Sequence, residues 1–214
     1  MDEVVRQAMA KWPKVPHCYG WLALDARGAF RMRDDAAQAA HLPGDVIRHP
    51  ALLSFIYRNY QHDDNGAWYF QNGPQRVFVE LEETPFIART DPIHGFVTHD
   101  GEPVVDVDAA WITAAGRLVL KSEEKIAMVD DRDLAESLTL LRMEGKPMDD
   151  AMLLDWLERM QGELALQLGQ HYLPVRPLKG GELGKQLGFE PHPARLNPPI
   201  TATASSSAPS HRTS

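Results

Sequence analysis

The sequence predicts an α+β fold in which antiparallel β-hairpins pack against helices, followed by a C-terminal helical pair and a disordered tail. Three observations carry this prediction. Between residues 19 and 129, short apolar or alternating runs are separated by turn residues, which is typical of hairpins. Between residues 130 and 175, apolar residues recur at helical spacing. From residue 191 onward Pro, Ser, Thr and Ala dominate, and core-forming residues are almost absent.

These patterns divide the chain into four parts. Residues 1–18 are expected to form an N-terminal helix and linker, and residues 19–129 a β-rich globular body with one helix. Residues 130–175 are expected to form a helical segment, and residues 176–214 a flexible or disordered tail. The length suits one domain with a sizeable core or two small domains.

The first elements combine helices with one hairpin. A helix over residues 2–12 ends before Pro13, because proline cannot continue it. Residues 21–24 and 29–32 flank a turn that ends in Gly28, which predicts a hairpin. A second helix over residues 50–61 starts with a proline, which suits a first turn, and carries an apolar stripe.

The next hairpin is expected to have two different faces. Residues 68–70 and 75–82 form its strands, and because Pro74 has no N–H to close a tight turn, we predict a four-residue loop with Tyr69 opposite Arg76. Successive side chains of a strand point to opposite faces. One face, the core face, carries Trp68, Phe70, Val77, Val79 and Leu81. The other, here called the mixed face, carries Tyr69, Arg76, Phe78, Glu80 and Glu82.

Two interpretations of the mixed face stay open. In one, Tyr69, Arg76, Phe78 and Glu80 form a contact surface for a ligand or partner, with a cation–π pair between Tyr69 and Arg76. In the other, the helix over residues 50–61 covers this face and buries it.

Further strands are predicted over residues 86–89, 96–99, 103–107, 111–113, 117–120 and 126–129. Asp130 and Asp149 are expected to cap the two helices of the C-terminal pair, since aspartate accepts hydrogen bonds from the first free N–H groups. The second helix is expected to run on to Leu168, although Gly162 weakens it.

Composition limits the partners. The net charge is −8, which argues against nucleic-acid binding and against docking on anionic lipid. We expect no signal peptide and no membrane span, and therefore a cytoplasmic protein that can form a homo-oligomer.

Cys18 is the single cysteine, so an internal disulfide is excluded, and we expect it to behave as a small apolar residue.

Catalytic motifs are largely missing from the sequence. It has neither a phosphate-binding loop of the usual patterns nor a nucleophile elbow. His94, His99 and Asp106 are the candidate metal ligands, because two imidazoles and a carboxylate near one strand suit a borderline cation. Their turn positions offer a plainer explanation for the acidic residues.

The run from Gly66 to Phe70, with Pro74, Val77, Val79 and then Glu82 to Phe86, resembles a family of uncharacterised proteobacterial proteins known as a domain of unknown function. The resemblance covers residues 19 to about 120. It implies a β-rich fold of repeated motifs and a link to signal transduction, and it implies no enzyme activity.

We therefore expect a non-catalytic intracellular module that binds a small ligand or a protein partner in a regulatory role, without a cofactor. The contact surface would be Tyr69, Arg76, Phe78 and Glu80. The alternatives are a metal-assisted hydrolase that uses His94, His99 and Asp106, and a structural or assembly protein.

Overall fold

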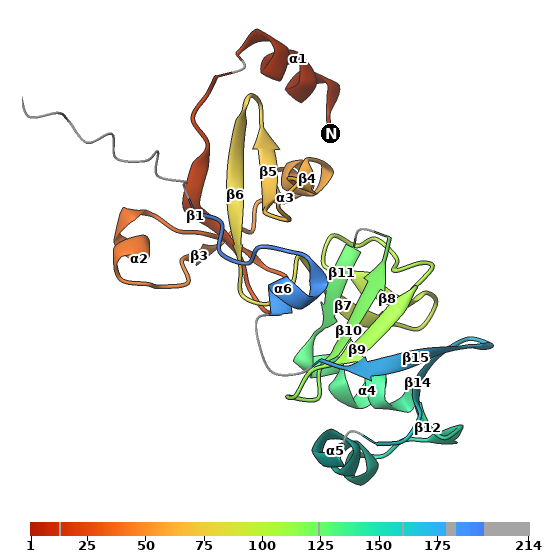
Figure 1. Ribbon diagram of the computed structural model, residues 1–214. Helices are drawn as coiled ribbons and strands as arrows, with labels where there is room; N and C mark the ends of the chain where they lie inside the picture. Colours follow the sequence, from red (N-terminus) through yellow and green to blue (C-terminus); the bar gives the residue numbers. More distant parts are fainter. Residues whose placement is uncertain (13, 124, 160, 179–182, 195–214) are drawn as a thin grey trace, which may run out of the picture.

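The strands of the molecule are divided between two β-sheets (Figure 1). The computed structural model describes residues 1–12, 14–123, 125–159, 161–178 and 183–194. The first sheet has six strands in the order β3-β2-β1-β6-β5-β4, antiparallel except for the pair β1–β6. Its strands are β1 (Cys18–Leu24), β2 (Phe30–Met32), β3 (Asp45–Val46), β4 (Tyr60–His62), β5 (Trp68–Asn72) and β6 (Gln75–Leu81).

The second sheet has nine strands in the order β13-β12-β14-β15-β9-β10-β11-β7-β8. Two of its pairings, β15–β9 and β11–β7, are parallel. Its strands are β7 (Phe86–Asp91), β8 (Gly95–Thr98), β9 (Ala109–Ile112), β10 (Leu118–Ser122), β11 (Lys125–Val129), β12 (Leu141–Met143), β13 (Lys146–Pro147), β14 (Leu164–Leu168) and β15 (His171–Pro177). The mixed α+β class is thus confirmed, with strands as the main element.

Six α-helices and one 3₁₀ turn are distributed over the two sheets in the described residues. They are α1 (Glu3–Lys11), α2 (Asp35–Ala39), α3 (Pro50–Arg58), η1 (Asp131–Asp133), α4 (Leu134–Thr139), α5 (Asp150–Arg159) and α6 (Leu183–Leu187). Figure 1 shows α1 and α3 beside the six-stranded sheet and α5 below the nine-stranded sheet. None of the described helices has the length and apolar character needed to cross a membrane.

One hydrophobic core joins the two sheets. It includes Leu22 and Val79 of the six-stranded sheet, Ile87 and Leu120 of the nine-stranded sheet, and Ile56 of α3. The alternation predicted for β5 and β6 holds: Trp68, Phe70, Val79 and Leu81 are buried in this core, and Val77 packs against it. Burial of these apolar side chains is the main stabilising contribution to the fold.

The β5–β6 hairpin is tighter than predicted. Asn72 pairs with Gln75, so the loop has two residues, and Tyr69 lies opposite Phe78 instead of Arg76. Gly73 has a φ of 56°, which suits the first central position of a type II′ turn. The missing N–H of Pro74 does no harm there, because the N–H of Gln75 closes such a turn. Since the register differs from the prediction by two residues, the faces are unchanged.

Two other predicted segments differ from the structure. The helix predicted over residues 50–61 stops at Arg58, and Tyr60–His62 forms β4, which pairs with β5. Residues 103–107 form no strand and contribute a single bridge between Val97 and Pro103. Strand β4 forms because its residues pair with β5, a contact that the apolar pattern of residues 50–61 does not contain.

The predicted C-terminal helical pair is not confirmed. The first helix ends at Thr139, and Leu141 lies in β12. The second ends at Arg159, and residues 164–168, which were expected to extend it, form β14. Gly162 between them has a φ of 94°, which a helix does not allow. Leu164 and Leu166 are buried at a spacing of two, so their apolar character belongs to a sheet.

Part of the segment assigned to the tail packs against the body. β15 continues to Pro177, and α6 lies between the two sheets (Figure 1). Phe189 is buried in the core, the Glu190 N–H donates to the Gly66 carbonyl at 3.0 Å, and the Leu81 N–H donates to the Pro191 carbonyl at 2.8 Å. Residues 195–214, where disorder was also expected, lie outside the described part of the chain.

Candidate functional site

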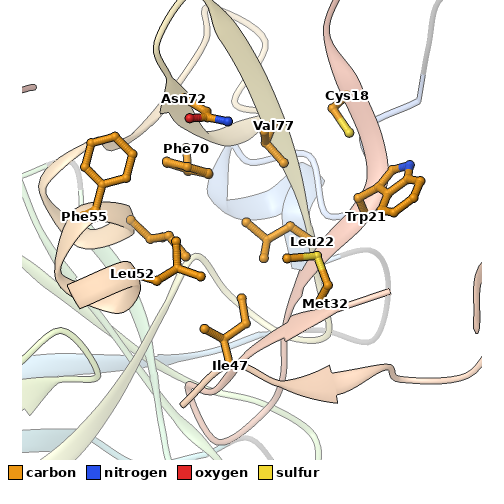
Figure 2. Close-up of a pocket in the computed structure, with 11 residues that line it drawn as sticks. Cys18, Trp21, Leu22, Met32, Ile47, Leu52, Phe55, Phe70, Asn72 and Val77 are labelled. Atoms are coloured by element: carbon orange, nitrogen blue, oxygen red, sulfur yellow. The ribbon is translucent and has the colours of Figure 1, made fainter. Parts of the chain in front are cut away.

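A cavity of about 280 Å³ opens on the core face of the six-stranded sheet, beside α3 (Figure 2). Small-molecule sites in proteins range from roughly 300 to 1,000 Å³, so this cavity suits a small ligand. Figure 2 shows side chains from α3 on one side of the cavity and side chains of β1, β2 and β6 on the other. Its lining consists of Cys18, Trp21, Leu22, Met32, Ile47, Leu52, Phe55, Ile56, Phe70, Asn72 and Val77.

An irregularity in β1 brings three of these residues to the cavity. Cys18 pairs with Val77 and Leu22 with Val79, so four steps along β1 match two steps along β6. Such a bulge changes the alternation of the side chains that it contains. Gly20, within the bulge, has a φ of 79°, a conformation that favours glycine. As a result, Cys18, Trp21 and Leu22 all line the cavity.

Helix α3 supplies the opposite wall. Pro50 occupies its first turn, and the side chain of His49 accepts a hydrogen bond from the Leu52 N–H at 3.4 Å. Leu52, Phe55 and Ile56 are spaced by three and one residues and therefore share one face of the helix. The ring of Phe55 meets that of Phe70 edge to face, with 5.5 Å between centroids. This pair fixes the distance between the helix and β5.

Uncharged groups make up the whole lining. None of the lining residues is Lys, Arg, His, Asp or Glu. Burial raises the pKa of the Cys18 thiol, which keeps it protonated at neutral pH. The floor is formed by buried Leu22, Ile56 and Phe70, whereas Trp21 is 39% exposed and Met32 45% exposed at the rim. Asn72 is the one amide in the lining.

The mixed face carries a second, smaller apolar cluster. Tyr69 and Phe78 are only 5% and 4% exposed, because Tyr19 stacks on Phe78 with 4.6 Å between ring centroids and an interplanar angle of 4°. The guanidinium carbon of Arg76 lies 4.5 Å from the centroid of the Tyr69 ring. The expected pairing of Tyr69 with Arg76 therefore occurs, across the diagonal of the hairpin. The cover comes from the segment before β1 and from Tyr19, not from α3.

Glu80, the fourth residue of the expected contact surface, lies at another part of the same face. It forms an ion pair with Arg33, whose side chain is 11% exposed. The Nε of Arg33 is buried and has no hydrogen-bond partner among the described residues. A pocket of about 370 Å³ lies beside this pair and is also lined by Asp25, Arg31 and Glu82. Arg31 is in turn paired with Asp25 at 2.8 Å, so both arginines of this pocket already have a carboxylate partner, and Glu82 accepts a hydrogen bond from the Ala26 N–H at 2.9 Å.

The structure does not bring His94, His99 and Asp106 together as metal ligands. Within the described residues, no group of three or more His, Cys, Asp or Glu side chains is arranged to hold a metal ion. His94 is exposed beside the Asp91 turn, where its N–H donates to the Asp91 carboxylate at 2.7 Å. Asp106 has a φ of 50°, which agrees with the plainer interpretation of a turn residue.

His99 lies instead at the junction of the two sheets. Its ring is surrounded by Phe30, Tyr57 and Phe86, with centroid distances of 5.7, 5.8 and 5.7 Å. Nδ1 accepts a hydrogen bond from the Ile87 N–H at 3.2 Å, and Nε2 is buried with no partner in the described chain. Burial lowers the pKa of His99 to about 4, so the ring is neutral at neutral pH. This is the environment of a structural histidine.

Sequence reasoning missed most of the cavity. Phe70 and Val77 were assigned to the core, and both line it. Trp21, Met32 and Ile47 carried no signal that separates a pocket wall from ordinary core, because both are apolar. Which apolar residues leave space between them is decided by packing and is not encoded in their spacing.

The comparisons with known proteins give a family and two similar structures. A family model described as Protein of unknown function (DUF2946) matches residues 1–194. The crystal structure of a DUF1285 family protein from Silicibacter pomeroyi DSS-3 is 14% identical, with a TM-score of 0.49, over 82% of this chain and 96% of that one. A DUF1285 family protein from Shewanella baltica OS155 is 14% identical, with a TM-score of 0.38, over 54% and 88%. None of the curated proteins matches the chain.

Proposed function

We propose that this chain, which belongs to the family described as Protein of unknown function (DUF2946), is a non-catalytic module that binds a small apolar ligand. The observation that carries the proposal is the cavity of about 280 Å³ beside α3, with its apolar floor and partly exposed rim. Sites of this kind gain affinity from buried apolar surface and orientation from a few polar groups. We assign the ligand to this cavity and not to the mixed face, because Tyr19 already covers Phe78.

A regulatory role in signalling is part of the same proposal. Helix α3 contributes three side chains to the cavity, and its C-terminal end holds the N-terminal helix α1. The Asp2 N–H donates to the Asn59 side chain at 2.9 Å, and Arg58 forms an ion pair with Asp2 at 3.2 Å. A ligand that shifts α3 therefore changes these two contacts between the end of α3 and the start of α1. Since Val5 of α1 is buried, with 2% exposure, the release of α1 would expose this side chain and the surface beneath it to a partner.

The test is binding of N-phenyl-1-naphthylamine, an uncharged dye that fluoresces in apolar sites. We expect the natural chain to bind it and Leu52→Trp to bind it at least about tenfold more weakly, because the larger side chain fills the cavity. Leu154→Trp is the matched control, since Leu154 is 63% exposed on α5 and lies outside the lining. Equal binding to all three proteins would contradict the proposed site.

A second measurement does not depend on a folded variant. Cys18 is the single cysteine of the chain and lines the cavity, so its reaction with a thiol reagent reports access to the cavity. We expect a saturating amount of the dye to slow this reaction. An unchanged rate, measured while the dye is bound, would show that the dye binds elsewhere and would remove the support for the cavity.

A further inference from the structure

We infer that the natural ligand of the cavity is an uncharged molecule with an apolar body and one hydrogen-bonding head group, which Asn72 contacts at the mouth. The inference rests on the proposed function and names the chemical class of the ligand. It follows from three features of the lining: the depth of its apolar floor, the absence of charged side chains, and the position of its one amide.

The floor selects for an apolar body. Leu22 and Ile56 are buried at 3% and 1% exposure, and Phe70 lies beside them. A polar group placed against these side chains would lose its hydrogen bonds to water and find no replacement. The part of the ligand that enters first must therefore be alkyl or aryl, and the volume of about 280 Å³ limits it to a short chain or a small ring system.

The absence of charge selects against fatty acids and amines. A buried ionised group needs a counter-charge or several hydrogen bonds, and no side chain of the lining offers a charge. Cys18 is the one titratable group, and because burial raises the pKa of its thiol, it does not provide a negative charge at neutral pH. An ionised ligand would have to keep its head group in water and lose part of its contact with the cavity.

Asn72 supplies the polar contact. It is the last residue of β5, is exposed, and lines the cavity beside Phe70 and Val77 (Figure 2). Its side chain is therefore accessible at the mouth, and an amide both donates and accepts hydrogen bonds. A hydroxyl, amide or ester carbonyl at the mouth can therefore pair with it. Medium-chain alcohols and neutral acyl amides or esters with short chains have this chemistry.

The experiment compares three ten-carbon probes that differ only in the head group: decan-1-ol, decanoate and decylamine. Each is titrated at pH 7 against the full chain with N-phenyl-1-naphthylamine bound, and its displacement of the dye is measured. We expect decan-1-ol to bind at least about tenfold more tightly than either charged probe, because a charged head that keeps its full hydration draws part of the chain out of the cavity.

Asn72→Leu tests the assignment of the head group. It removes the amide and keeps a side chain of similar size, so we expect the affinity for decan-1-ol to fall about threefold to tenfold while that for the dye changes less. Asn65→Leu, in an exposed turn on the same sheet and outside the lining, is the control and should leave both affinities unchanged.

The outcomes separate this inference from the proposed function. If the dye does not bind, or binds without slowing the reaction of Cys18, the cavity is not a ligand site and both ideas fail. If the dye binds but decanoate or decylamine competes as well as decan-1-ol, the site stands and the uncharged class is wrong. If Asn72→Leu binds decan-1-ol with unchanged affinity, the head group does not contact Asn72 and that part of the inference is overturned.

Discussion

We expect His99 to make the stability of the protein depend on pH, at pH values above those at which the carboxylates of the protein titrate. The folded chain holds the ring neutral, with a pKa of about 4, among Phe30, Tyr57 and Phe86. An unfolded histidine has a pKa near 6.5. Between these two values the unfolded state binds more protons than the folded state, so acidification favours unfolding. Stability is therefore fully present above pH 6.5 and is lost as the pH falls towards 4.

The size of the effect follows from the two pKa values. Linkage between pH 7 and pH 5 gives a loss of about 2 kcal/mol in the free energy of unfolding, and the loss reaches about 3 kcal/mol once the pH is below 4. The structural cause is that Nδ1, which accepts from the Ile87 N–H, takes the added proton and loses that hydrogen bond, while the N–H at Nε2 is buried without a partner in the described residues. The carboxylates of Asp100 and Asp25 offset only part of the lost hydration.

The assay is urea unfolding at pH 7 and pH 5, followed by tryptophan fluorescence. His99→Asn keeps an acceptor for the Ile87 N–H and does not titrate, so its loss between the two pH values should be smaller than that of the natural chain by about 2 kcal/mol. His94→Asn is the matched control, because His94 is exposed. His17 has a lowered pKa through partial burial and is present in all three proteins, so it cancels in the comparison. An equal loss in the natural chain and in His99→Asn would refute the reasoning.

Two further predictions concern stability and use paired variants measured by urea unfolding. Gly28→Ala should destabilise the fold by about 2–4 kcal/mol and Gly101→Ala by about 1 kcal/mol. Both glycines have a positive φ, of 79° and 86°. A Cβ on Gly28 would lie 2.4 Å from the Cβ of His99, whereas a Cβ on Gly101 would face open space. Equal losses of stability in the two variants would show that the contact with His99 relaxes freely. Glu80→Ala should cost about 1–3 kcal/mol, because it leaves the largely buried Arg33 without its carboxylate. Asp155→Ala, at an exposed ion pair with Arg159, should cost less than about 0.5 kcal/mol, and a Glu80→Ala loss that small would mean that water replaces the carboxylate.

The cavity shows why site residues were harder to foresee than strands. Val77 was correctly placed on the core face of β6, because alternation along one strand is a local property. Its neighbour across the cavity is Leu52, which belongs to α3 and lies 25 positions earlier in the chain. Whether these two side chains touch or leave a gap depends on how α3 docks, and the pair Phe55–Phe70 sets that distance. No spacing rule contains this information.

The mixed face illustrates the same division. The sequence was sufficient to place Tyr69, Arg76 and Phe78 on one face and to expect the contact between Tyr69 and Arg76. It was not sufficient to identify the cover, because Tyr19 reaches Phe78 only through the parallel pairing of β1 with β6. Parallel pairing joins segments that are far apart in the chain, and its partners are chosen by the whole sheet.

The sequence by itself determined which residues are apolar, which alternate and where turns interrupt them, and this was enough for the α+β class, most hairpins and the core face of β5 and β6. The tertiary structure alone decided that residues 164–168 join a nine-stranded sheet instead of extending a helix. Two leucines can be buried by a helix or by a strand, and it is the pairing of this segment with β12 and β15 that makes it a strand. It also decided that Phe189 returns to the core and that a cavity remains beside α3. The physical reason is that hydrogen-bond ladders and packing gaps are properties of pairs of distant segments, whereas side-chain patterns are properties of one segment.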